Sequence, residues 1–209
     1  KNENAKVIIL KSEGDKAFCA GASFDELLEI KDFETGKNFF MGFALLINAM
    51  RKCPKFIIAR VHGKAVGGGV GIAAAADYTL AVSSASVKLS ELALGIGPFV
   101  VGPAVERKIG KSAFAQMSID YDWYPANWAL AEGLFAEVYE TIEELDAVVY
   151  ALAEKLAEGS ADAMKKLKEV LWEGTENWDE LLEKRAEISG QLILSDFSKN
   201  YINNFKNKN

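Results

Sequence analysis

The chain has 209 residues, of which 50% are hydrophobic and 26% charged, and this composition excludes a disordered or fibrous protein. Its formal net charge of −6 argues against a large nucleic-acid-binding face, which requires a basic surface. No apolar run is long enough to span a bilayer and no secretory leader is visible, so we expect a cytoplasmic protein that binds neither membranes nor nucleic acid.

In the first half of the chain, strand patterns alternate with helical ones. Short β-branched runs predict strands at residues 7–10, 56–59 and 78–82, and helical spacing predicts helices at 24–50 and 70–76. The first helix is expected to break near Thr35 and Gly36 and to end before Pro54. Alternation of this kind favours an α/β fold with parallel strand pairing.

The second half of the chain is predicted to be nearly all helix. Thr141 and Glu144 form a capping-box pattern, and amphipathic segments follow at 161–172 and 178–205. No repeat period or linker is visible. We therefore divide the chain into a core at residues 1–140 and a helical region at 141–209.

Several conspicuous side chains have structural interpretations. His62, the only histidine, is expected at a strand end with its ring hydrogen-bonded. Trp172 and Trp178 are interpreted as helix-packing residues. A solvated helix face is expected to carry Lys165, Lys166 and Lys168.

A triple-glycine turn, Gly67 to Gly69, joins a predicted strand to an alanine-rich helix. Glycines let the backbone approach a ligand closely, and the first N–H groups of the helix point outward at its positive dipole end. Such donors suit a carbonyl oxygen that becomes an oxyanion. Two alternatives stay open: a plain tight turn, and a dinucleotide loop in which Glu91 would supply the acidic residue about 20 positions on.

Two further segments complete the pattern. The small-residue loop at 20–23 follows the first strand and precedes a helix, so it can supply a second backbone donor. Glu91 is flanked by apolar residues, and partial burial would raise its pKa toward a value suited to proton transfer. Alternatively, Glu91 is a surface residue in a turn.

Together these segments resemble the crotonase family of enoyl-CoA hydratases and isomerases. The matching stretches, in the family's order, are residues 16–22, 61–77, 90–98, 111–114 and 128–138. The resemblance implies a spiral α/β core of ββα units, a helical C-terminal region that forms a homotrimer or homohexamer, and an acyl-CoA thioester as substrate. It implies coenzyme A as part of the substrate and no separate cofactor.

The resemblance also implies site residues. Ala22 and Gly68 match the two oxyanion-hole donors, and Glu91 matches the second of the two glutamates that hydratases use. The strip that lines the pantetheine and adenine in the family matches Ala20, Ala22, Ser23, Phe24 and Asp25. No metal site is implied, and Cys19 and Cys53 predict none.

Three departures from the family pattern bear on function. Gly71 stands where hydratases carry their first catalytic glutamate, which favours double-bond isomerisation over hydration. Ser23 replaces the usual Asp, a change that a backbone contact tolerates. The family's opening strand pair and helix, ahead of Val7, are expected to be missing.

We therefore expect an acyl-CoA enzyme, an isomerase or lyase of fatty-acid metabolism, that stabilises a thioester enolate. If it hydrates instead, Asp120 or Asp122 would supply the second carboxylate. The tail at 205–208 is a candidate contact for a neighbouring subunit's CoA phosphate. An alternative of another class is a non-catalytic subunit that binds acyl-CoA as a scaffold.

Overall fold

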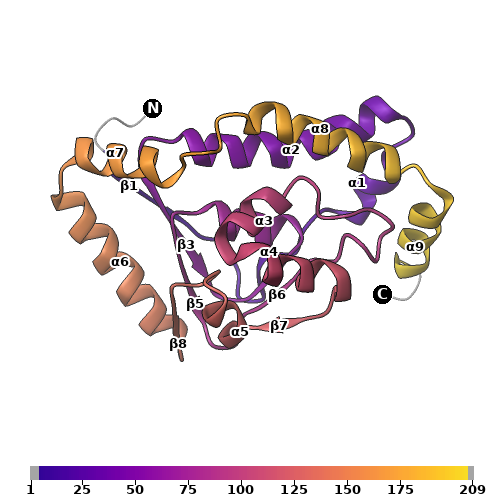
Figure 1. Cartoon of the computed structure of the whole chain (residues 1–209). Helices are drawn as coiled ribbons and strands as arrows, with labels where there is room; N and C mark the ends of the chain where they lie inside the picture. Colours follow the sequence, from indigo (N-terminus) through magenta and orange to yellow (C-terminus); the bar gives the residue numbers. More distant parts are fainter. Residues whose placement is uncertain (1–4, 207–209) are drawn as a thin grey trace.

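The computed structural model describes residues 5–206. Its elements follow in chain order: β1 (Val7–Leu10), β2 (Ala17–Cys19), α1 (Phe24–Glu29), α2 (Phe33–Lys52), β3 (Phe56–Val61), β4 (Lys64–Val66), α3 (Gly68–Ala75), β5 (Tyr78–Val82), β6 (Ser86–Lys88), α4 (Gly102–Asp120), β7 (Tyr124–Pro125), α5 (Ala126–Ala131), β8 (Glu137–Tyr139), α6 (Ile142–Glu158), α7 (Ala161–Leu171), α8 (Trp178–Leu192) and α9 (Asp196–Lys206). Three strand–strand–helix units begin at β1, β3 and β5 (Figure 1). The predicted α/β spiral is therefore confirmed.

The strands of each unit contribute to two different sheets. The first strands form a parallel sheet in the order β1-β3-β5-β8, and the second strands form a smaller sheet in the order β2-β4-β6-β7. In the smaller sheet β2, β4 and β6 are parallel, whereas β7 is antiparallel to β6. The loops that leave β2, β4 and β6 therefore lie at one edge, and the residue that precedes β7 lies there too.

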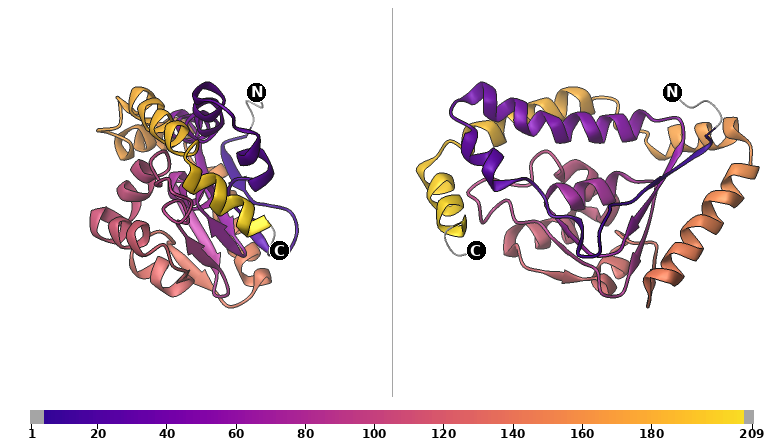
Figure 2. Two further views of the ribbon diagram at one scale, coloured as in Figure 1. Left: turned by 90° about the vertical axis from the view of Figure 1, so that its right-hand side faces the viewer. Right: turned by 180° about the vertical axis from the view of Figure 1, so that it is seen from behind.

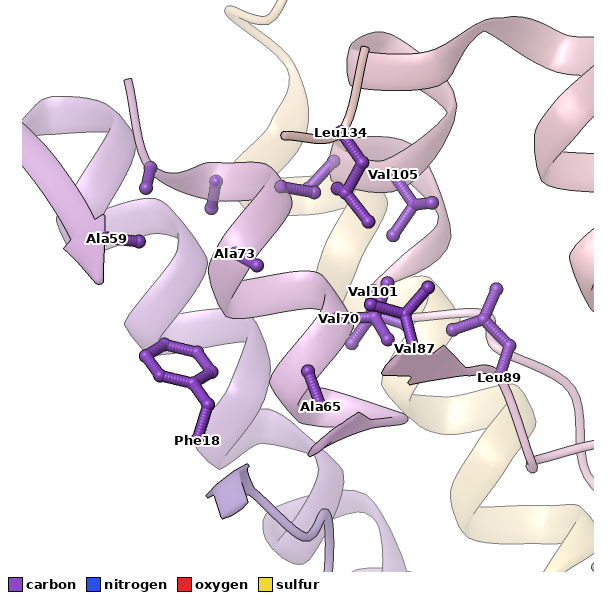
Figure 3. Close-up of a cluster of buried hydrophobic side chains, with 14 of the residues drawn as sticks. Phe18, Ala59, Ala65, Val70, Ala73, Val87, Leu89, Val101, Val105 and Leu134 are labelled. Carbon is purple, nitrogen blue, oxygen red and sulfur yellow. The ribbon is translucent and has the colours of Figure 1, made fainter. Parts of the chain in front are cut away.

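Helix α3 lies in the centre of the core and is apolar on all sides, which is typical of a fully buried helix (Figure 3). Val70 and Ala73 on α3 are fully buried, and Val101 packs beside Val70. The small side chains of α3 let the surrounding strands and α4 approach closely. This helix begins at the triple-glycine turn, so the core itself fixes the position of that turn.

Helices α2 and α8 run side by side along one edge of the molecule (Figure 1). A methyl group added at Gly36 would lie 2.8 Å from the carbonyl oxygen of Gly190, so two glycines allow close backbone contact. The expected helix break near Thr35 and Gly36 is wrong. The helices separate at residues 30–32, because Asp32 and Thr35 form a capping box that starts α2.

The expectation for Lys168 is also wrong. Its side chain is 2% exposed, and its ammonium group donates to Asp77 Oδ2 at 2.7 Å and to the Lys55 carbonyl at 2.9 Å. Lys165 and Lys166 are exposed, as expected. Trp172 and Trp178 are buried and pack edge to face, which confirms their predicted role.

His62 lies directly after β3 and is 3% exposed. Neither ring nitrogen has a hydrogen-bond partner in the part of the chain that the structure describes, so the expectation of a hydrogen-bonded ring is wrong. Burial is the main cause that lowers the pKa of His62, followed by the charge of Arg60.

The predicted capping box of Thr141 and Glu144 is confirmed at the start of α6. This helix packs against all four strands of the first sheet. The division of the chain at residue 140 and trimerisation through the C-terminal helices stay predictions. Within residues 5–206, no helix is both long enough and apolar enough to cross a bilayer.

Candidate active site

The triple-glycine turn connects β4 to α3. Gly67 has a φ of +52°, in the region that favours glycine, and its N–H donates to the Lys88 carbonyl at 2.8 Å. A methyl group added at Gly68 would lie 2.1 Å from Phe43 Cε1. The N–H of Gly68 donates to no acceptor within residues 5–206. The turn therefore presents an unoccupied backbone donor that no side chain can cover.

The loop after β2 lies against this turn. Gly21 has a φ of +87°, and a methyl group added there would lie 3.1 Å from the Val66 carbonyl oxygen. The next residue, Ala22, lines the same pocket as Gly68, and its N–H also has no acceptor among the described residues. Ser23 then caps α1 by accepting from the Glu26 N–H at 3.4 Å.

Glu91 lies in the loop after β6, beside the glycine turn. Its Oε1 is 3.0 Å from the place that a methyl group on Gly67 would take. The residue is half-buried because part of it faces the pocket, yet Oε2 is inaccessible and has no hydrogen-bond partner in the described chain. Burial raises the pKa of Glu91 to about 7, and hydrogen bonds from the backbone amides of residues 90 and 91 partly oppose this shift.

These three segments line one pocket of about 610 Å³, a volume suited to a small ligand. Apolar side chains form most of its wall, among them Phe40, Phe43, Leu94 and Val101. Glu91 is the only carboxylate among the described residues that line it. The pocket can therefore hold an apolar group beside the Glu91 carboxylate and the N–H groups of Ala22 and Gly68, which are unpaired within residues 5–206.

Helix α9 packs against α1 (Figure 2), and two of its side chains line the pocket. Phe205 packs edge to face on Phe24 with ring centroids 4.7 Å apart, and Tyr201 also lines the pocket. Phe205 thus contacts its own chain, and the contact of the tail with a neighbouring subunit stays a prediction. Asn207 and Lys208 lie outside the described residues.

Val101, the residue before α4, fills the space beside Gly71. A methyl group added there would lie 2.6 Å from both Cβ and Cγ1 of Val101. Val101 therefore occupies the space that a side chain on this turn of α3 would need. This close packing leaves no room for a side chain at Gly71, the position that the resemblance matches to the first glutamate of hydratases.

The structure brings together most of the predicted site residues. Ala20, Ala22, Phe24, Gly68 and Glu91 all line the pocket. Ser23 and Asp25 do not line it, and Ser23 instead serves as a helix cap.

Asp120 and Asp122, the candidates for a second carboxylate, are exposed and do not line the pocket. Asp120 accepts a hydrogen bond from the Tyr124 hydroxyl. Sequence reasoning missed Lys88, Trp123 and Phe43, which do line the pocket. Lys88 lies three residues before Glu91, a proximity that could have drawn attention to it.

Comparisons with known proteins agree on one family. The model of the family described as enoyl-CoA hydratase/isomerase matches residues 1–208. A short-chain-enoyl-CoA hydratase of Clostridium acetobutylicum is 29% identical over 203 residues, which are 96% of this chain and 77% of that protein. A mitochondrial 3-hydroxyisobutyryl-CoA hydrolase of Bos taurus is 34% identical over 110 residues, which are 50% of this chain and 28% of that protein.

Solved structures show the same similarity. The crystal structure of an enoyl-CoA hydratase from Mycobacterium avium subsp. paratuberculosis K-10 has a TM-score of 0.84 and 27% identity. The match covers 97% of this chain and 78% of that one. These relatives bear the names of two different reactions, hydration and thioester hydrolysis, so similarity alone does not select the reaction.

Proposed function

The chain belongs to the enoyl-CoA hydratase/isomerase family, and from that premise we propose that it moves the double bond of a 3-enoyl-CoA thioester to the 2-position. The observation that carries this proposal is the single carboxylate of the pocket, Glu91. A double-bond shift needs one group that takes a proton from one carbon and returns it to another. Hydration needs, in addition, a group that orients a water molecule.

The thioester carbonyl is proposed to accept hydrogen bonds from the N–H groups of Ala22 and Gly68. Both residues line the pocket and neither N–H donates to an acceptor within residues 5–206, which supports this role. As a proton leaves C2, negative charge grows on the carbonyl oxygen. Preorganised backbone donors in a dry site stabilise that charge, and each can lower the barrier by roughly 3–4 kcal/mol.

Glu91 is proposed as the proton carrier. As a carboxylate it takes the proton from C2 of the 3-enoyl thioester, and the electron pair moves into a dienolate. Glu91 then returns the proton to C4, the C2–C3 double bond forms, and the carboxylate is restored. A pKa of about 7 suits both steps, because the group accepts and releases a proton with similar ease near neutral pH.

The packing around Gly71 supports isomerisation over hydration. Val101 fills the space next to Gly71, so a second carboxylate is absent there and could not be added without moving Val101. The exposed Asp120 and Asp122 do not compensate, since neither lines the pocket.

The test is to incubate the full chain with 3-hexenoyl-CoA and, separately, with crotonyl-CoA, and to follow the absorbance of the conjugated thioester. We expect the absorbance to appear with the first substrate and to persist with the second. Glu91→Gln, which keeps the shape and removes the titratable group, is expected to lower kcat for isomerisation by about 10²–10⁴-fold.

Two outcomes would contradict the proposal. Loss of the crotonyl-CoA absorbance at a rate similar to isomerisation would identify a hydratase. CoA-thioester binding without any turnover of 3-hexenoyl-CoA would identify a non-catalytic scaffold.

A further inference from the structure

The smaller sheet sets the order of groups along the pocket. Because β2, β4 and β6 are parallel and β7 is antiparallel, one edge carries in sequence the Ala22 loop, the glycine turn, the Glu91 loop and Trp123. Val87 pairs with Tyr124, which places Lys88 beside Trp123 in the next register position. Trp123 therefore lies past Glu91, at the end of the row opposite Ala22.

This order assigns a direction to the bound substrate, on the basis of the proposed function. The carbonyl lies between Ala22 and Gly68, and Glu91 must reach the acyl carbons. The acyl chain therefore extends from the carbonyl toward Glu91, and beyond it toward Lys88 and Trp123. These two residues, which line the pocket, face the far end of the acyl group.

Two lysines meet at the ring of Trp123. Lys64 Nζ lies 5.1 Å and Lys88 Nζ 5.8 Å from the ring centroid, within the range of cation–π contacts. Val66 pairs with Lys88 and lies two residues after Lys64, so all three side chains share the pocket face of the sheet. The ring itself is 42% exposed, and so accessible to a ligand.

Neither lysine is neutralised within the described chain. No carboxylate of residues 5–206 lies within 4.0 Å of Lys64 Nζ or Lys88 Nζ. Burial is the cause that raises the pKa of Glu91, the backbone amides of residues 90 and 91 oppose this rise, and Lys88 is not among the causes of the shift. An anion bound beside Trp123 would bring an opposite charge to both ammonium groups.

We propose that Lys64, Lys88 and Trp123 form a binding site for a carboxylate at the far end of the acyl chain, so that the preferred substrates are thioesters of dicarboxylic acids. The two ammonium groups pair with the terminal carboxylate, and the indole ring packs on the methylene groups before it. The remaining pocket wall is apolar and suits those methylene groups.

The test measures binding of unreactive, saturated thioesters, so it does not depend on turnover. Dissociation constants are determined by calorimetry for chain-matched pairs that end in a carboxylate or a methyl group: glutaryl-CoA and pentanoyl-CoA, adipoyl-CoA and hexanoyl-CoA, suberoyl-CoA and octanoyl-CoA. In at least one pair, the carboxylate-ended thioester is expected to bind at least about tenfold more tightly to the wild-type chain. That preference should weaken as the salt concentration rises.

Variants connect the preference to these residues. Lys88→Met is expected to remove most of the preference, Lys64→Met to reduce it, and Lys88→Arg to retain it. Lys111→Met, which removes an exposed lysine of α4 outside the pocket, is the matched control and should leave the preference unchanged.

The same anionic chemistry could come from the phosphates of coenzyme A, and the pairs separate the two sources. If Lys88→Met weakens both members of every pair equally, the lysines hold CoA and the inference is overturned. Equal binding within all three pairs also overturns it. Failure of the proposed function is a separate result, because it would appear as an absence of turnover with 3-hexenoyl-CoA.

Discussion

Two buried carboxylates lie in this molecule under opposite conditions. Asp77, with a side chain 5% exposed, accepts from the Ile57 N–H at 2.8 Å, from Lys168 Nζ at 2.7 Å and from Trp172 Nε1 at 3.1 Å. Glu91 has one oxygen that is inaccessible and has no partner within residues 5–206. The same chemical group has partners for both oxygens in one place and an oxygen without a partner in the other.

The difference separates a structural role from a chemical one. Asp77 follows α3 and, through its three donors, connects the start of β3 to α7 and to Trp172 directly after it. Breaking a buried ion pair with complete hydrogen bonding is costly, so the fold depends on this pairing. Among the described residues, Glu91 accepts only from backbone amides of its own loop, and burial raises its pKa to about 7. Its carboxyl group is thus available for proton transfer near neutral pH.

The largest expected effect on stability is at the satisfied carboxylate. Asp77→Asn removes the negative charge that pairs with the buried Lys168 ammonium and leaves it only neutral acceptors, such as the Lys55 carbonyl. An uncompensated buried charge of this kind typically lowers the free energy of unfolding by about 3–5 kcal/mol. Urea denaturation at neutral pH measures this loss.

Two variants serve as controls for that experiment. Glu180→Gln breaks the exposed pair with Lys184, which solvent screens, and should leave the free energy of unfolding nearly unchanged. Adding Lys168→Met to Asp77→Asn removes the buried charge and should recover much of the loss. If the single Asp77→Asn variant is as stable as the wild type, the contrast between the two carboxylates does not hold.

The next effect is the pH dependence that Glu91 imposes. Its pKa of about 7 in the folded chain exceeds the ordinary value of 4.5, so the folded state binds the proton more tightly. The stabilisation is complete below pH 4.5 and is lost as pH rises through 7, for a total of about 3 kcal/mol.

Glu91→Gln should remove this slope. Urea titrations at pH 5 and pH 8 are expected to show that the variant gains stability relative to the wild type at the higher pH. Parallel stability curves for the two chains would show that Glu91 is not held protonated by the fold.

The contrast between the two carboxylates was only half predictable from sequence. Glu91 has apolar neighbours in the chain itself, and these already indicated burial and a raised pKa. The pairing of Asp77 with Lys168 joins residues 91 positions apart, and Lys168 follows two exposed lysines on an amphipathic helix. No local pattern distinguishes a lysine that finds a distant carboxylate from one that is solvated.

The same limit applies to the pocket. The glycine turn and the loop before Phe24 carry their own backbone signals, so their place in the pocket could be predicted. Lys64, Lys88 and Trp123 come from three strands or strand ends, and only the order of the smaller sheet brings them together. The role of Val101 was hidden for the same reason, because it fills the space beside Gly71 from the start of another helix.

The smallest expected effect concerns a third buried group, His62, which extends the comparison to a base. Like Oε2 of Glu91, its ring nitrogens have no hydrogen-bond partner within residues 5–206. Burial again favours the neutral form, but for a base this lowers the pKa below the ordinary 6.5. Arg60 beside it, itself paired with Asp146, adds to the shift. As pH falls, His62 therefore binds a proton at a higher pH in the unfolded chain than in the folded chain. The contribution to stability is present above pH 6.5 and is lost as pH falls below it.

Between pH 6.5 and pH 5, Glu91 changes stability in the opposite direction to His62. The chains with and without His62 are therefore compared in a Glu91→Gln background. There we expect His62→Asn to lose less free energy of unfolding between pH 6.5 and pH 5 than the chain with His62. Equal losses in the two chains would mean that the imidazole gains a partner or solvent on protonation. In that case an unpartnered group in this fold would not by itself imply a shifted titration, and the argument for Glu91 would rest on its position in the pocket alone.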